Sequence, residues 1–192
     1  MQTDSDLIGN LKQGSLEALG ELYDRHQRMV YRTALVITGD AEAAADLLQD
    51  VFLRLHRFSC HIDPKRPLEP WLYRMTANLA YTWVKRSQRW LPSIEEVADL
   101  LMGVRGMLSE DTATPEGEWR HIQQAISSLS INQRIVVVLY YVNDLSLQEI
   151  AEILDVPVGT VKSRLHYGRE VLKKKLGLSV NDRMTDLRCE FT

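Results

Sequence analysis

The sequence predicts an all-α protein with two small helical domains joined by a flexible, acidic linker. Two observations support this fold class. Apolar residues recur at the three-and-four spacing of helices in both halves of the chain, and acidic residues gather between the halves in a segment with several prolines and glycines. We therefore expect domains at residues 1–90 and 119–177, a linker at 91–118 and a tail at 178–192.

The first half is expected to form three long helices. An apolar stripe predicts the first helix, and Thr38-Gly39 is typical of a helix C-terminus. Asp40 is a suitable N-cap for the second helix, over residues 41–57, and a proline-punctuated loop at 64–70 precedes the third, over 71–90. The stripe of the first helix consists of Leu16, Leu19, Leu22, Tyr23, Met29, Val30, Ala34 and Ile37.

The net charge of −3 is an average over segments of unlike charge. Residues 91–118 contain one basic and seven acidic residues, whereas residues 119–177 contain eight basic and five acidic residues. The acidic total therefore does not exclude nucleic-acid binding, because the last folded segment is basic.

The second half is expected to be helical from about Pro115 onward. Ile122, Ile126 and Leu129 share one helix, and residues 135–142 belong to the next. The β-branched run at 135–138 would suit a strand in isolation. We interpret it as helix because helical segments flank it and no second strand is available to pair with it.

A helix-turn-helix is predicted near the C-terminus. Ser146 and Glu149 form a capping box that begins its first helix, in which the small side chain of Ala151 lets the second helix approach closely. Asp155 can adopt the left-handed conformation that the turn requires, and Pro157 suits the first turn of the following helix.

The second helix of this motif would present polar and cationic side chains outward, because Val161 and Leu165 lie four residues apart and pack inward. Such a helix fits the major groove of DNA, where its early residues reach base edges and flanking cations contact phosphates. The alternative is a helical hairpin with a solvated basic face, which leaves the coincidence of spacing, turn and charge unexplained. The candidate DNA contacts are Thr160, Lys162, Ser163, Arg164, His166, Tyr167 and Arg169.

Residues 145–166, LSLQEIAEILDVPVGTVKSRLH, resemble the promoter-reading C-terminal domain of sigma factors of the extracytoplasmic-function (ECF) type in the sigma-70 family. Residues 129–134, LSINQR, are similar to the segment with which the family begins this domain. The chain departs from the pattern at Asp155, where glycine is usual, and at Tyr167, where a basic residue is common. The resemblance implies a transcription initiation factor whose second domain reads the minus-thirty-five promoter element.

A second segment, DLLQDVFLRL at residues 46–55, is similar to the polymerase-binding helix of that family. Its polar residues Asp46, Gln49 and Asp50 share one helical face, which could dock on a basic surface of a partner. An ordinary solvated face is the alternative, and by itself this charge pattern favours that alternative. The helix-turn-helix further along the chain makes the docking face the preferred interpretation. We therefore interpret the three residues as polymerase-binding.

Residues 70–89 interleave aromatic residues, an amide and basic residues. This mixture suits single-stranded DNA, since cations track phosphates while aromatic and polar groups receive unstacked bases. The stretch resembles the helix with which the family reads the minus-ten element and opens the strands. The resemblance places Asn78 beside the pocket for a flipped base, and Trp71 is interpreted as a core residue. The candidate minus-ten contacts are Asn78, Tyr81, Lys85, Arg86 and Arg89.

Neither catalysis nor cofactor binding is indicated. The sequence contains no glycine-rich phosphate loop, no Gly-x-Ser-x-Gly and no His-Glu-x-x-His. His56, Cys60 and His61 lie close together, but a fourth ligand is missing and the spacing is unusual for zinc. Cys60 is instead interpreted as a small buried residue. We therefore expect no enzyme activity, no cofactor and no metal.

A cytoplasmic location is expected. The N-terminus is acidic, and no apolar run approaches the ~18 residues that span a membrane. The resemblance implies three partners: core RNA polymerase, promoter DNA in duplex and single-stranded non-template form, and an anti-sigma factor.

Two other functions are compatible with part of the sequence. A stand-alone helix-turn-helix regulator would share the C-terminal motif, but would not explain the acidic face and the aromatic-basic helix of the first half. A helical adaptor that binds only proteins would leave the outward cations Lys162 and Arg164 unexplained.

Overall fold

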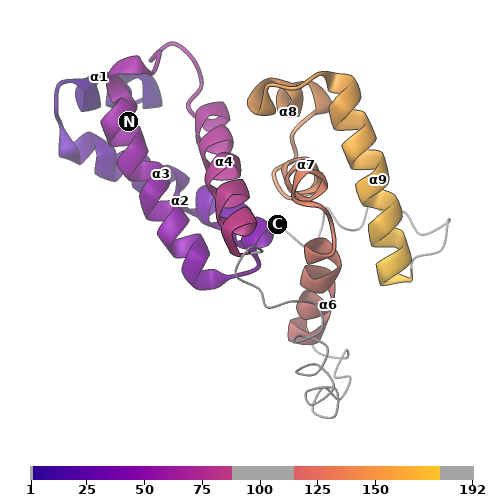
Figure 1. Cartoon of the computed structure of the whole chain (residues 1–192). Helices are drawn as coiled ribbons and strands as arrows, with labels where there is room; N and C mark the ends of the chain where they lie inside the picture. Colours follow the sequence, from indigo (N-terminus) through magenta and orange to yellow (C-terminus); the bar gives the residue numbers. More distant parts are fainter. Residues whose placement is uncertain (1, 88–114, 178–192) are drawn as a thin grey trace.

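The computed structural model describes residues 2–87 and 115–177, with side chains described from residue 121 in the second range. These residues form eight α-helices and one short 3-10 helix, and no strand occurs among them. The all-α prediction is confirmed. Figure 1 shows the helices in two groups, one from each half of the chain.

The N-terminal group contains four α-helices: α1 (Asp4–Lys12), α2 (Leu16–Thr38), α3 (Ala41–Phe58) and α4 (Glu69–Ser87), with the 3-10 helix η1 (Ser59–His61) after α3. Helix α2 is the centre of the group, because α1, α3 and α4 all pack against it. An apolar cluster with Leu22, Val51, Leu55 and Leu72 at its centre fills the space between these helices, and each of the four is fully buried.

The predicted junction between α2 and α3 is confirmed. Helix α2 ends at Gly39, which has φ 74° and lies in the left-handed region that favours glycine. Asp40 then caps α3, since its Oδ1 accepts a hydrogen bond from the amide of Ala43 at 2.9 Å. Leu16 departs from the predicted stripe: it is the first residue of α2 and is 66% exposed.

Helix α1 was not among the predicted helices. Thr3 and Asp6 form a capping box at its start, and Leu7, Ile8 and Leu11 on its inner face are buried. A threonine followed three residues later by an acid, ahead of apolar residues, is a known helix-start signal. The sequence therefore contained the information for α1.

The C-terminal group contains α6 (Pro115–Ser127), α7 (Ile131–Tyr141), α8 (Leu147–Leu154) and α9 (Val158–Leu176). The helical interpretation of residues 135–138 is confirmed, because this run lies inside α7 and is buried throughout. Leu129, predicted to share a helix with Ile126, lies two residues beyond the end of α6 but is also buried.

Cys60 corrects a prediction, because it is exposed. The turn η1 directs its neighbour Ser59 inward instead, where that side chain is 5% exposed and its hydroxyl donates to the carbonyl of His56 at 2.9 Å. Since consecutive residues in such a tight turn point in different directions, Cys60 faces the solvent.

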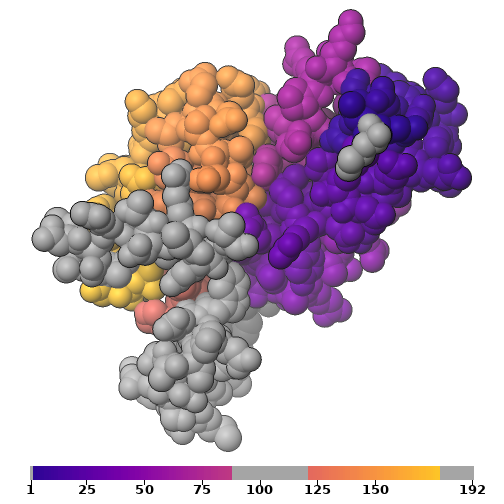
Figure 2. Space-filling model, turned by 180° about the vertical axis from the view of Figure 1, so that it is seen from behind, coloured from indigo at the N-terminus to yellow at the C-terminus, as the bar shows by residue number. Residues whose placement is uncertain are grey.

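The two helical groups pack against each other. Helices α2 and α4 contact helices of the C-terminal group. Figure 2 shows the orange atoms of the C-terminal group against the magenta and violet atoms of the N-terminal group. Within the described ranges, no helix is both long and apolar enough to cross a lipid bilayer.

Candidate nucleic-acid interface

The helix-turn-helix forms as the capping residues predict. Ser146 Oγ accepts from the amide of Glu149 at 3.2 Å, and Glu149 Oε2 accepts from the amide of Ser146 at 2.8 Å. Hydrogen bonds from the Ser146 side chain and from the Ser146 backbone amide hold the pKa of the Glu149 carboxyl below its usual value. The start of α8 is therefore stabilised by a carboxylate that is charged at neutral pH.

The turn depends on a left-handed residue. Asp155 has φ 54° and ψ 51°, and the amide of Val156 donates to the carbonyl of Ala151 at 3.1 Å. Pro157 was expected in the first turn of the following helix. It is instead the residue immediately before α9, which begins at Val158. Val161 and Leu165 then pack into the core, with exposed fractions of 0% and 3%. Their burial orients α9, the second helix of the helix-turn-helix.

The outward side of α9 carries most of the predicted minus-thirty-five residues. Four of the seven are exposed: Lys162, Ser163, His166 and Tyr167. The other three are half-buried: Thr160, Arg164 and Arg169.

Arg169 has a structural contact that its predicted role did not include. Its Nε donates to the hydroxyl of Tyr141 at 2.7 Å, and its guanidinium lies 5.3 Å from the ring centroid of Tyr140. Stacking on aromatic rings is a common use of arginine. Arg169 therefore links α9 to α7, in addition to any contact that it makes with DNA.

Helix α4 presents the predicted minus-ten residues on its surface. Asn78, Tyr81 and Lys85 lie at three- and four-residue spacing, and the Lys85 ammonium is 6.0 Å from the centroid of the Tyr81 ring. Arg86 is exposed as well, and Arg89 lies outside the described residues. The predicted core residue Trp71 is half-buried against the N-terminal apolar cluster.

Helix α3 separates its polar and apolar residues as predicted. Asp46, Gln49 and Asp50 are exposed, whereas the intervening leucines and valine are buried. Leu53 was not singled out, but it is 64% exposed and lies three residues after Asp50, so it extends the same face. The sequence did contain a signal for Leu53, because helical spacing from Asp50 places this apolar residue on the outward face.

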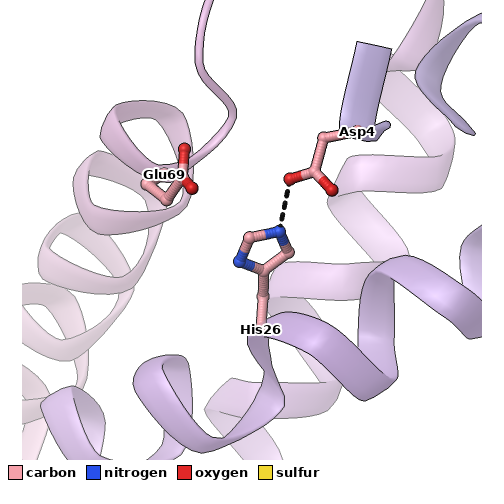
Figure 3. A group of neighbouring side chains, drawn as sticks. All are labelled: Asp4, His26 and Glu69. Carbon is pink, nitrogen blue, oxygen red and sulfur yellow. Dashed lines mark hydrogen bonds and ion pairs between the residues drawn. The ribbon is translucent and has the colours of Figure 1, made fainter. Parts of the chain in front are cut away.

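Three helices of the N-terminal group contribute side chains that together could hold a metal ion. Asp4, His26 and Glu69 come from α1, α2 and α4, and their ligand atoms all lie within 4.8 Å of one another (Figure 3). His26 Nε2 is 2.6 Å from Asp4 Oδ2, and Arg25 Nη1 donates to Asp4 Oδ1 at 2.8 Å. Because both oxygens of Asp4 are engaged, we interpret the group as an ionic attachment of α1 to α2.

This attachment should make the stability of the N-terminal group depend on pH. Burial by itself raises the pKa of the Asp4 carboxyl, but hydrogen bonds and charge from His26 and Arg25 outweigh it and lower that pKa. A carboxyl with a lowered folded-state pKa stabilises the fold above its unfolded pKa, and this contribution is lost as pH falls through the folded value. Asp4→Asn should therefore reduce the free energy of unfolding by about 1–2 kcal/mol at neutral pH. It should also make the stability of the variant depend less on pH in the acidic range.

Thermal melting between neutral and acidic pH measures this effect, with Asp24→Asn as the control at an exposed carboxylate of α2. Equal melting curves for Asp4→Asn and the unmodified chain would contradict the attachment. A melting temperature that zinc raises in the unmodified chain, and not in Asp4→Asn, would identify a metal site instead.

Family models match both halves of the chain. Residues 22–90 match sigma-70 region 2, and residues 120–172 match sigma-70 region 4. The chain is 35% identical over 176 residues to the ECF RNA polymerase sigma factor SigW of Bacillus subtilis, an alignment that covers 88% of this chain and 94% of SigW.

Two solved structures share the fold. One is CnrH in complex with the cytosolic domain of CnrY, with a TM-score of 0.66, 23% identity, and coverage of 91% of this chain and 97% of that one. The other is the sigma factor RpoE in complex with the anti-sigma factor NepR from Bartonella quintana, with a TM-score of 0.64, 19% identity, and coverage of 85% and 99%. Together with the sequence relationship to SigW, the helix-turn-helix and the matched regions show that this chain belongs to the ECF family of RNA polymerase sigma factors.

Proposed function

We propose that the chain directs core RNA polymerase to promoters through three separate surfaces. The polymerase-binding surface is the exposed face of α3 with Asp46, Gln49 and Asp50. Two carboxylates and an amide on one helical face suit a basic partner surface, where complementary charge speeds association and selects the partner. The exposed Leu53 beside them adds an apolar contact.

The minus-thirty-five element is read by α9. Its N-terminal half carries the side chains that reach base edges in the major groove, and Lys174 and Lys175 near its end are exposed for phosphates. The capping box and the left-handed Asp155 fix the angle between α8 and α9, so these side chains keep one orientation.

The minus-ten element is read by α4. Asn78 and Tyr81 receive unstacked bases of the non-template strand, while Lys85 and Arg86 contact its phosphates. The four side chains are exposed on α4, and their mixture of an amide, an aromatic ring and two cations suits the unstacked bases and phosphates of a single strand.

Other partners and the place of action follow from the family. An anti-sigma factor is expected to bind the chain, and the support is that two structures with the same fold are complexes with a protein of that kind or with a cytosolic domain. The chain acts with polymerase in the cytoplasm as a regulatory protein, and it catalyses no covalent step of its own.

The observation that carries this proposal is the outward row of polar and cationic side chains on α9 above the buried Val161 and Leu165. The test combines the full chain, core polymerase and a library of promoter-length duplexes, and detects strand opening with a reagent specific for unpaired thymine. We expect open complexes on a subset of sequences, only when the chain and polymerase are both present.

The two alternative functions give different results in the same assay. A stand-alone regulator would select duplexes without polymerase and open none of them. An adaptor would bind neither duplex nor single strand. Either result with correctly folded protein would overturn the proposed function.

A further inference from the structure

Helix α9 packs closely against α7 at Gly168. A Cβ atom at this position would lie 2.9 Å from Cγ2 of Val137, which is too short for a real contact between carbon atoms. The lack of a side chain at Gly168 therefore lets the two helices approach each other. The next residue, Arg169, is consequently within reach of two aromatic side chains at the end of α7.

These two aromatic residues, Tyr140 and Tyr141, surround the guanidinium of Arg169. Its Nε donates to the Tyr141 hydroxyl at 2.7 Å, and its central carbon lies 5.3 and 5.5 Å from the centroids of the two rings. The rings are 4.9 Å apart with an interplanar angle of 81°, so they form two walls of one cradle. Tyr141 is 8% exposed, and the packing around it fixes its ring. We call Tyr140 and Tyr141 the tyrosine cradle.

The tyrosine cradle leaves the positive charge of Arg169 uncompensated. In the described parts of the chain, Arg169 forms no ion pair, and its terminal N–H groups donate no hydrogen bond. The neighbouring carboxylate of Glu170 pairs with Lys173 instead, at 3.3 Å. A tyrosine hydroxyl is a neutral acceptor, so it orients the guanidinium without cancelling its charge. The unused edge of an oriented guanidinium suits a phosphate, which arginine binds through two parallel hydrogen bonds.

Arg169 lies on a face of α9 that begins among the predicted DNA contacts. Residues of this face follow one another at spacings of four, three and four, so they line up along the helix. They are Lys162, His166, Arg169 and Lys173. In a helix-turn-helix, the N-terminal residues of the second helix contact base edges. Arg169 lies about three turns after the start of α9, so it is placed for the sugar-phosphate backbone at the edge of the groove.

We propose that the tyrosine cradle holds Arg169 as a preorganised clamp for one backbone phosphate of the minus-thirty-five duplex. Tyr141 is then a positioning residue, because it acts on DNA only through Arg169. An arginine side chain that is not held loses rotamer freedom when it binds, and this loss weakens binding. The cradle orders Arg169 during folding, so less freedom is lost at the DNA. The inference rests on the proposed function, because that function places α9 against duplex DNA.

Tyr141→Phe tests the proposal, because it removes the hydroxyl acceptor and keeps the ring. The matched control is Tyr23→Phe, which removes the hydroxyl of a half-buried tyrosine of α2. Arg169→Ala and the double variant with Tyr141→Phe complete the set. The affinity of the full chain for a labelled duplex of randomised sequence is measured at about 50 to 200 mM salt, since phosphate contacts do not depend on sequence. Thermal melting of each variant shows whether it is folded.

The clamp predicts different salt dependence for the two residues. Arg169→Ala should reduce the magnitude of the slope of log affinity against log salt concentration by ~0.9, because one phosphate contact is lost. Tyr141→Phe should weaken binding roughly three- to tenfold with an unchanged slope, because the charge remains but its orientation is lost. In the Arg169→Ala background, Tyr141→Phe should change the affinity by less than about twofold. Tyr23→Phe should bind like the unmodified chain.

Three results would overturn the clamp. An unchanged slope in folded Arg169→Ala, or no duplex binding by the unmodified chain, would leave Arg169 only as a link between α7 and α9. An unaltered affinity in Tyr141→Phe would show that the cradle does not act on DNA. A loss in Tyr141→Phe that is equal with and without Arg169, or equal to that in Tyr23→Phe, would give Tyr141 a purely structural role.

The result for the clamp is separate from that for the proposed function. If no promoter is opened with polymerase, but the slope falls in Arg169→Ala and Tyr141→Phe acts only when Arg169 is present, the clamp is a duplex contact and the proposed function alone is wrong. If promoters are opened and the slope is unchanged, the proposed function stands and the clamp is wrong.

Discussion

Asp50→Arg is expected to weaken the binding of the full chain to core polymerase by about 100-fold. Asp50 is exposed in the middle of the α3 face, between Asp46 and Leu53. Reversing its charge removes an attraction to a basic partner and introduces a like-charge contact, and such a contact costs several kcal/mol when it is desolvated. The affinity can be measured by titrating labelled chain with core polymerase at fixed ionic strength.

Two further variants separate the polymerase contact from general effects of charge. Asp50→Asn keeps the shape of the side chain and should lose less affinity than Asp50→Arg. Asp24→Arg makes the same charge reversal on α2 and should leave polymerase binding within a factor of about two. If Asp24→Arg and Asp50→Arg weaken binding equally, the effect is long-range and α3 is not the docking face. Binding of free Asp50→Arg to duplex DNA should not be reduced.

The helices were predictable from the sequence because their signals are local. Gly39 and Asp40 end one helix and begin the next within two residues, and Ser146 with Glu149 begins α8 over four. Asp155 was placed correctly in the turn because only a few residue types adopt positive φ there. These features depend on backbone conformation over one or two turns.

The packing of the two groups was not predictable in the same way. Arg74, Arg32 and Arg134 donate to carbonyls that are 79, 110 and 97 residues away in the chain. Backbone carbonyls leave no mark in the sequence, so these arginines resemble ordinary surface residues. Arg134 alone carried a signal, because it is the one charged residue between Ile131 and Tyr141.

The candidate site was predicted as a set of residues, but its geometry was not. Helical spacing indicated that Asn78 and Tyr81 share a face and that Arg164 belongs to α9. It could not indicate that all three line one cavity, because that depends on the relative position of the two groups. The exposed Cys60 was missed for a related reason: a tight turn, with no periodic pattern, decides which neighbour faces inward.

Arg164→Ala is expected to reduce transcription from a cognate promoter by about 10- to 100-fold while reducing binding to randomised duplex much less. Arg164 lies nearly two turns beyond the start of α9 at Val158 and is half-buried. A bidentate contact of arginine with a guanine edge contributes about 1–3 kcal/mol of discrimination between bases. Transcription from the best library promoter and from single-base variants of it measures this discrimination.

The comparison with a lysine and with a distant cation decides between base reading and phosphate binding. Arg164→Lys keeps the charge but loses the planar fork, so it should retain little of the discrimination. Lys174→Ala removes an exposed cation near the end of α9 and should weaken binding to all DNA sequences alike. It should also reduce the magnitude of the slope of log affinity against log salt concentration by ~0.9. If Arg164→Ala behaves like Lys174→Ala, Arg164 is a phosphate contact. Because Arg164 also lines the cavity shared with α4, an unchanged radius of gyration is needed to show that its effect arises at the DNA.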